Sequence, residues 1–164
     1  MKYSKNINRN TVIKKKNVQA AELALARFCS YQDRTLIQVR DKLKKLGIEK
    51  NEWDKIILKL TQDGFLDEER YARSYVSGKF RLNKWGRLKI IHSLQSKGIS
   101  TELINKAFNS LGEEEYRNQM KKMINDKYKT LEDGDPLIKK HKVARFMFSK
   151  GFENSLIWEI LNDL

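Results

Sequence analysis

The chain has 164 residues, enough for one domain with a fair core or a short array of repeated units, but too few for two large domains. One proline, eight glycines and 34% charged residues favour helices over strands, which need more turn residues. A single cysteine excludes an internal disulfide, and no apolar run reaches the roughly 18 residues of a membrane-spanning helix. We therefore expect an all-α protein of the cytoplasm, without membrane contact.

The net charge of +13 is concentrated in two segments. Residues 1–16 carry six Lys or Arg and no acidic residue, and residues 70–101 carry eight and no acidic residue, whereas the rest of the chain is close to neutral. Proteins that bind polyanions gather cations in this way, because each neutralised phosphate releases a counterion. We interpret residues 1–16 as a basic N-terminal tail that adds nonspecific affinity for nucleic acid, and residues 70–101 as the candidate binding segment.

Three repeats follow an opening helix at 17–33, and they align on Gly47, Gly98 and Gly151. Apolar residues stand four and eight positions before each glycine and ten and thirteen positions after it, ending at Leu164. Steps of three and four on both sides of a glycine are typical of two amphipathic helices joined by a left-handed cap. The sequence therefore predicts an internal helical repeat.

Residues that begin helices support this division. Thr35 with Gln38 predicts a capping box, and Asn51 and Ser100 suit the starts of later helices. A third helix follows in the first two repeats, with one apolar stripe that includes Tyr116. We expect one domain over 17–164, with repeat one at 34–82, repeat two at 83–131 and a truncated repeat three at 137–164. Tandem three-helix repeats of this kind predict an elongated, curved array.

The sequence offers no sign of catalysis, a metal or a cofactor. Phosphate-loop, dinucleotide and zinc-protease motifs are absent, and His92 and His141 lack partners at ligand spacing. Cys29 is expected to pack in a core. The acidic runs at 67–69 and 113–115 stand at predicted helix starts. A carboxylate there interacts favourably with the positive end of the helix dipole and stabilises the helix by roughly 0.3–1 kcal/mol. A metal-dependent nuclease that uses these runs is the alternative interpretation.

The basic segment is harder to explain by local stability. If Gly86 is an N-cap, then Lys84, Arg87 and Lys89 oppose the dipole of the following helix, whose free N–H groups and cations predict a phosphate or carboxylate site. Trp85 has the position of a hydrophobic staple against Ile90, with base stacking as the alternative. The candidate contacts to nucleic acid or to a protein–DNA filament are Arg70, Arg73, Lys79, Arg81, Lys84, Arg87, Lys89 and Lys97, with Trp85 for stacking.

Three sequence stretches resemble the RecX family of RecA regulators. "DGFLDEERYARSYV" is similar to the family's G-aromatic/Leu-L-D-D/E-x-R-aromatic-A segment, "WG" followed by "LKIIHSLQSKGIS" to its G-x-x-R/K-I run, and "RFMFSKGF" to its C-terminal motif. The likeness covers about residues 18–164. It departs from the family at residues 1–16 and at "TLIQV", which stands where the family has S-x-x-E/D-L.

The resemblance implies tandem three-helix repeats and a non-enzymatic role. It implies a monomer that binds RecA and the RecA–single-stranded DNA filament, limits filament extension, and lowers ATPase, recombinase and coprotease activity in DNA repair and the SOS response. Direct binding to DNA is expected to be weak. The alternative from the residues alone is a helical module that binds DNA or RNA independently of RecA.

Overall fold

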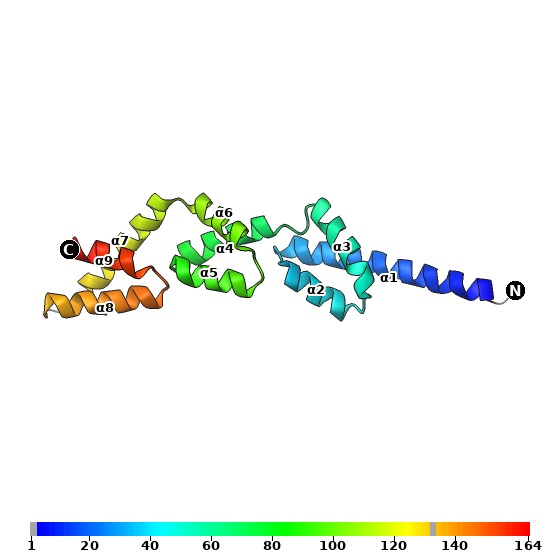
Figure 1. Ribbon diagram of the computed structural model, residues 1–164, viewed down its shortest axis with the longest axis horizontal. Coiled ribbons are helices and arrows are strands. Elements are labelled where there is room, and N and C mark those ends of the chain that lie inside the picture. Colours follow the sequence, from blue (N-terminus) through cyan, green and yellow to red (C-terminus); the bar gives the residue numbers. More distant parts are fainter. Residues whose placement is uncertain (1–2, 132–133) are drawn as a thin grey trace. The chain divides into compact units, whose positions relative to one another are not determined.

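The computed structural model describes residues 3–131 and 134–164, with side chains described from residue 17 onward. The described residues form nine helices and no strand (Figure 1), so the predicted all-α class is confirmed. The side chains of the basic tail at 1–16 lie outside this description. The helices are α1 (Tyr3–Tyr31), α2 (Leu36–Lys45), α3 (Lys50–Gln62), α4 (Glu68–Arg81), α5 (Arg87–Ser96), α6 (Thr101–Leu111), α7 (Glu113–Lys129), α8 (Pro136–Ser149) and α9 (Asn154–Asn162).

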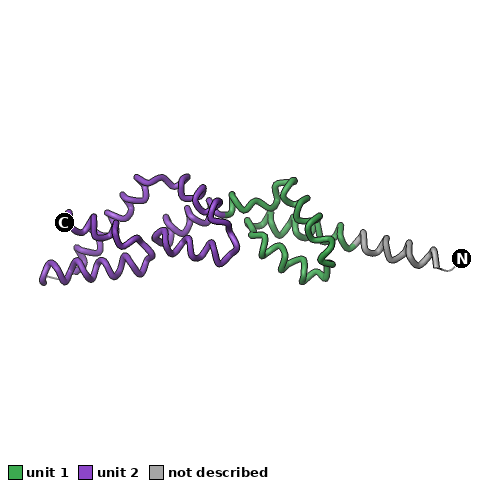
Figure 2. The backbone as a smooth tube through the Cα atoms, in the orientation of Figure 1, with its two compact units in different colours: residues 1–71 green, residues 72–164 purple. Residues whose placement is uncertain are grey.

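The chain divides into two compact units, residues 1–71 and residues 72–164 (Figure 2). In the first unit, α1, α2 and α3 each pack against the other two. Cys29 is 3% exposed inside this core and is therefore a packing residue, as predicted. The buried side chains that hold the three helices together are Leu25, Cys29, Val39, Leu43, Ile56, Leu60 and Leu66.

In the second unit, α7 is the central helix. It packs against α6, α8 and α9, while α8 also packs against α9 and α5 against α6. Tyr116, Met120 and Ile124 on α7 are fully buried, which confirms the predicted stripe. The ring centroid of Tyr116 lies 5.4 Å from that of Phe80 and 5.6 Å from that of Phe152. Aromatic rings from three segments thus form the middle of this core.

The three aligned glycines end helices as the sequence predicts. Gly47, Gly98 and Gly151 have φ of 68°, 79° and 88°. At each, the glycine N–H donates to the carbonyl three residues earlier, and the next N–H donates to the carbonyl five residues earlier. This is the Schellman motif, whose left-handed residue costs other amino acids roughly 1–2 kcal/mol. The repeated glycine therefore reflects a repeated backbone turn.

Two details of the predicted helices need correction. The Thr35 and Ser100 side chains accept N–H groups as N-caps, but α3 begins after Glu49, so the predicted start at Asn51 was wrong. Leu164 is 52% exposed, although the repeat pattern places it on an apolar face. The face of the second helix in each repeat is centred instead on the ninth position after the glycine, at Ile56, Ala107 and Ile160, which are all buried.

The start of α5 lies against the turn between α8 and α9. Gly86 is the N-cap of α5, as predicted. Its N–H donates to the Lys150 carbonyl at 2.8 Å, and the Leu88 N–H donates to the Gly151 carbonyl at 3.0 Å. A Cβ atom built on Gly86 would stand 2.3 Å from backbone atoms of Gly151. This backbone junction therefore has no room for a side chain at Gly86.

A methyl group at Gly86 should destabilise the second unit. Because its neighbours are backbone atoms, Gly86→Ala is expected to lower the free energy of unfolding by about 1–3 kcal/mol. Gly78→Ala is the matched control: Gly78 lies within α4, nothing stands within 4 Å of its Cβ position, and alanine there should stabilise by roughly 0.5–1 kcal/mol. Urea denaturation measures both changes. Equal stability of the two variants would contradict the junction.

The Tyr116 hydroxyl joins α7 to the junction. It donates to Glu153 Oε2 at 2.5 Å and accepts the N–H of Arg87, the first residue of α5, at 3.0 Å. Burial, followed by the hydrogen bond to Glu153, raises the pKa of Tyr116 well above its ordinary value. The hydroxyl is thus held in its protonated form in the folded state.

This raised pKa predicts a loss of stability at alkaline pH. Tyr116 in the unfolded chain loses its proton near its ordinary pKa of 10.0, while the folded chain keeps it. The free energy of unfolding should be unaffected below that pH and should fall above it by about 1.4 kcal/mol per pH unit from this group. Tyr116→Phe should remove this decline and cost roughly 1–3 kcal/mol at neutral pH. Tyr31→Phe, at a side chain that is 87% exposed, is the control, and the same alkaline slope in Tyr116→Phe as in the unaltered protein would refute the assignment.

Candidate polyanion-binding surface

The connection between α4 and α5 holds the centre of the basic segment. After α4 ends, the Lys84 N–H donates to the Phe80 carbonyl at 3.1 Å. The Trp85 N–H donates to the Lys79 carbonyl at the same distance. Lys84 has a φ of 57°, a left-handed conformation that normally favours glycine. The turn therefore fixes an exposed lysine and a half-buried tryptophan at the end of α4.

Trp85 has lysine ammonium groups over its ring. The Nζ of Lys79 lies 4.9 Å from a ring centroid, and the Nζ of Lys89 lies 4.8 Å from it. Each such contact contributes about 0.5–1 kcal/mol at an exposed site. The aromatic ring thus gathers positive charge from α4 and α5, and a base that stacked on it would have to displace an ammonium group. Stacking by Trp85 and its staple contact with Ile90 both stay predictions.

Tyr75 extends the same arrangement along α4. The ammonium groups of Lys79 and Lys97 lie 5.4 and 5.8 Å from its ring centroid, and its hydroxyl bonds Ser93 Oγ at 2.7 Å. Arg73 is exposed on the same helix. We call the residues that these contacts and the α4–α5 turn bring together the lysine–aromatic surface: Tyr75, Lys79, Lys84, Trp85, Lys89 and Lys97.

Two of the candidate arginines are held by carboxylates. Arg70 Nε donates to Asp33 at 2.8 Å and its Nη1 lies 3.6 Å from Asp67. Arg81 makes a two-point contact with Glu115, at 2.7 and 2.8 Å. The hydrogen bond that Arg70 donates to Asp33 raises the pKa of Arg70, and the one that Arg81 donates to Glu115 raises the pKa of Arg81. These arginines join helices, in the geometry that suits a planar guanidinium.

Arg87 is the most enclosed of the candidate cations. Its Nη1 donates to Glu153 and its Nη2 to Glu113, both at 2.8 Å, and its guanidinium lies 4.3 Å from the centroid of the Tyr116 ring. Burial alone would lower the pKa of Arg87, but the two carboxylates outweigh it and the pKa is raised. Arg87 therefore ties the first residue of α5 to α7 and to the turn before α9.

The N-terminus of α5 differs from the anion site that the sequence predicts. That prediction needs free N–H groups, but three of them donate inside the second unit, so this part of it was wrong. Gly86, Arg87 and Leu88 donate to the Lys150 carbonyl, the Tyr116 hydroxyl and the Gly151 carbonyl. The same contacts offset the unfavourable position of Lys84 and Lys89, because the negative end of α8 meets the positive end of α5.

Lys150 is a cation that the sequence analysis does not include. It is the last residue before Gly151, its carbonyl accepts the Gly86 N–H, and its Nζ lies 5.7 Å from the Phe146 ring centroid. The backbone junction brings it next to the start of α5. The position of Lys150 beside α5 results from a contact between segments far apart in the sequence. The motif "RFMFSKGF", which contains Lys150, is the one signal in the sequence that points to this residue.

The four candidate lysines differ from Arg70, Arg81 and Arg87 in their partners. Among the described residues, no carboxylate forms an ion pair with Lys79, Lys84, Lys89 or Lys97. Their ammonium groups rest on aromatic rings or point to solvent, so they remain available to an external anion. Of the eight predicted cations, these four lysines are therefore the ones whose charge no described carboxylate neutralises.

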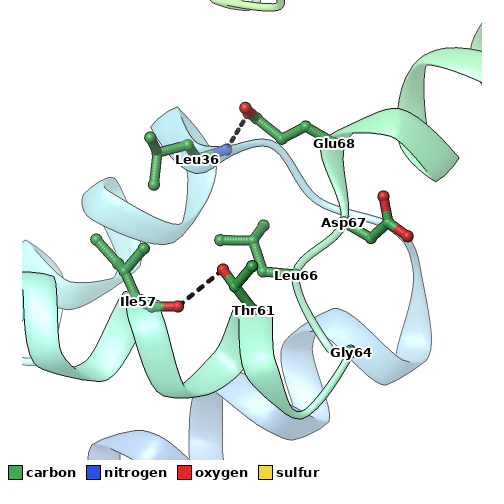
Figure 3. A pocket seen from close by; sticks show the side chains of 7 residues that line it. All are labelled: Leu36, Ile57, Thr61, Gly64, Leu66, Asp67 and Glu68. Carbon is green, nitrogen blue, oxygen red and sulfur yellow. Dashed lines mark hydrogen bonds between the residues drawn. The ribbon is translucent and has the colours of Figure 1, made fainter. Parts of the chain in front are cut away.

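The acidic runs have structural roles. Glu68 accepts the N–H of Leu36, the first residue of α2, at 2.7 Å (Figure 3). The cleft of about 390 Å³ beside it is lined by apolar side chains, including Ile57 and Leu66, and by polar ones, including Thr61. Glu113 and Glu115 hold the arginines described above. Within the described residues, no cluster of His, Cys, Asp or Glu could hold a metal ion. The nuclease interpretation stays an untested alternative.

Comparison with known proteins identifies related domains from residue 67 onward. Residues 67–107 match the model of the second three-helix domain of RecX, and residues 113–161 match that of the third. The matched domains begin with α4 and with α7. In the glycine-centred division of the sequence, α4 and α7 are instead the last helices of repeats one and two. The tandem three-helix organisation is confirmed, and the two schemes divide the same helices differently.

Relatives and solved structures agree with these matches. Proteins named "Regulatory protein RecX" from Lactobacillus delbrueckii subsp. bulgaricus and Clostridium tetani are 32% and 31% identical over 90% and 84% of this chain. The chain spans about half of the former (54%) and 64% of the latter. The crystal structure of RecX from Lactobacillus salivarius superposes with a TM-score of 0.84 at 24% identity, covering 92% of this chain and 97% of that one. Within residues 3–131 and 134–164, no helix has the length and apolar character needed to cross a bilayer. The chain belongs to the RecX family of regulatory proteins.

Proposed function

We propose that this protein is a non-catalytic regulator that binds RecA and RecA–single-stranded DNA filaments in the cytoplasm. Binding limits filament extension and lowers the ATPase, recombinase and coprotease activities of RecA in DNA repair and the SOS response. Family membership is the observation that carries this proposal. Because the chain spans only part of the length of its relatives, the activity of the whole protein is part of the proposal.

The lysine–aromatic surface is the part of the chain that best fits such a filament. Its four ammonium groups lack carboxylate partners among the described residues, and lysine is a compact charge suited to phosphate. The arginines nearby are engaged within the fold. We infer that the lysines contact DNA phosphates or an acidic surface of RecA, while Arg81 and Arg87 maintain the helix packing of the second unit that presents them.

A binder of bare nucleic acid is the second candidate, and the unpaired lysines around Trp85 favour it too. The two candidates differ in what they bind best. Neutralising about six phosphates gives a log–log salt slope near −5 on duplex DNA, so a nucleic-acid module should bind bare DNA tightly at low salt and weakly at high salt. The RecA regulator should instead bind RecA filaments much more tightly than bare DNA at the same salt concentration.

Removing the lysine charges should weaken inhibition of RecA. We expect the variant Lys79→Gln, Lys84→Gln, Lys89→Gln and Lys97→Gln to need at least about tenfold more protein for half-inhibition, which corresponds to 1.4 kcal/mol of binding energy. The measurement is the ATPase rate of RecA on single-stranded DNA with this protein below stoichiometry. The variant also loses the lysine–ring contacts, each worth about 0.5–1 kcal/mol, so its thermal unfolding should occur at a lower temperature, and circular dichroism should show that it is still folded at the temperature of the assay.

A matched control removes the same charge from the other unit. Lys44, Lys45, Lys50 and Lys55 are exposed on or beside α2 and α3, and their change to Gln should leave inhibition almost intact. Equal loss in both variants would show that only net charge matters and would reject the assigned surface. If the unaltered protein leaves RecA activity unchanged but binds bare DNA with the steep salt slope, the nucleic-acid module is the better account.

A further inference from the structure

Helix α8 has a broad face that the other described residues of the second unit leave uncovered. Val143, Ala144 and Met147 are buried and fix the inward side of the helix. At 100° per residue, the exposed side chains cover a continuous arc of about 140° on the other side. We call this arc the outer face of α8; its large side chains are Leu137, Ile138, His141, Lys142, Arg145 and Phe148.

The outer face exposes more apolar surface than a solvated helix needs. Leu137, Ile138 and Phe148 are 60%, 54% and 60% exposed. His141 lies between them in the arc, and its ring packs edge-on against Trp158 of α9, with centroids 5.0 Å apart. Single exposed apolar residues are common, but three large ones on one helix face, with polar residues between them, indicate an interaction surface.

The charged residues of this face are all of one sign. Lys142 and Arg145 lie between the apolar ends, and neither forms an ion pair with any described residue. Residues 136–152 contain no acidic residue. Other cations of the second unit lie over aromatic rings, for example Lys139 over Tyr128 at 4.7 Å. The outer face therefore presents two free cations between apolar groups.

The spacing along the helix defines the shape of a matching ligand. Ile138 and Phe148 are ten residues apart, which places them about 15 Å apart along the axis at 1.5 Å per residue. The exposed positions 138, 141, 145 and 148 follow the steps of three and four that form the ridge of a helix, against which another helix packs. A phosphate chain has no apolar groups to cover the two ends, whereas a polypeptide helix does.

We propose that the outer face of α8 docks an acidic amphipathic helix of a partner protein. Its apolar side chains cover Leu137 and Ile138 at one end and Phe148 at the other, and Asp or Glu residues between them pair with Lys142 and Arg145. This mode is the helix-against-surface recognition of peptides, with apolar anchors and a charged middle. It goes beyond the proposed function, because its ligand is an amphipathic helix with apolar anchors and its residues are not those of the lysine–aromatic surface.

A synthetic peptide tests this docking site directly. The peptide is about 16 residues long, because shorter isolated helices are only marginally formed, and it carries leucines in its first and last turns with glutamates between them. Its binding to the full-length protein is measured by fluorescence anisotropy. We expect saturable binding that weakens at least about tenfold when Ile138 and Phe148 are both changed to Ser, or when Lys142 and Arg145 are both changed to Glu.

Matched control variants distinguish binding at this site from nonspecific apolar contact and from an effect of net charge. Leu58→Ser removes an apolar side chain of similar exposure, 57%, from α3, and Lys44→Glu with Lys45→Glu reverses two exposed charges on α2. Both should bind the peptide like the unaltered protein. All the changed side chains are exposed, so circular dichroism and thermal unfolding should confirm that each variant folds.

Two further ligands decide between kinds of partner. A single-stranded oligonucleotide and an anionic lipid vesicle should bind the Ile138→Ser, Phe148→Ser variant as they bind the unaltered protein. The proposal is overturned if the peptide does not bind, if the α8 variants bind it normally, or if these variants lose the oligonucleotide or the vesicle instead. Loss of RecA inhibition in the lysine variants would leave this test unaffected, so the two proposals can fail separately.

Discussion

The backbone of Gly86 lies directly against the backbone of Gly151, and two hydrogen bonds join the start of α5 to the turn between α8 and α9. Segments that are far apart in sequence are fixed here without any side chain between them. The Tyr116 hydroxyl adds a third bond to the same helix start and donates to Glu153. The packing of the second unit, and with it the position of the lysines on α4 and α5, depends on this contact.

The junction also explains how a helix start tolerates several cations. Helix dipoles disfavour positive charge at an N-terminus, but the C-terminal end of α8 faces the N-terminal end of α5, and Glu113 and Glu153 neutralise Arg87. Arginine and lysine are therefore used differently in this region. Arginine makes fixed two-point contacts that hold helices together, while lysine keeps its charge on aromatic rings where an external anion can reach it.

Features that repeat along the chain, such as helix ends and buried stripes, could be predicted from the sequence. Contacts between residues far apart in the sequence could not. The left-handed turns at Gly47 and Gly151 and the buried stripe at Tyr116 follow from local backbone conformation and helical spacing. The pairing of Arg87 with Glu153, and the approach of Lys150 to Gly86, depend on which helices meet in space. The density of positive charge in the sequence predicts a free anion site at the start of α5. That prediction is wrong because the sequence does not show which groups of the fold bind these N–H groups and Arg87.

Hydrogen exchange of the first amides of α5 tests the junction most directly. Helix-start N–H groups normally exchange quickly, because they have no partner within the helix. If the junction forms, the amides of Gly86 and Leu88 should exchange as slowly as those of Met120 and Ile124 in the core of α7, through global unfolding of the second unit. Exchange as fast as that of the first-turn amides of α3, whose N-cap residue makes no side-chain capping hydrogen bond, would contradict the account.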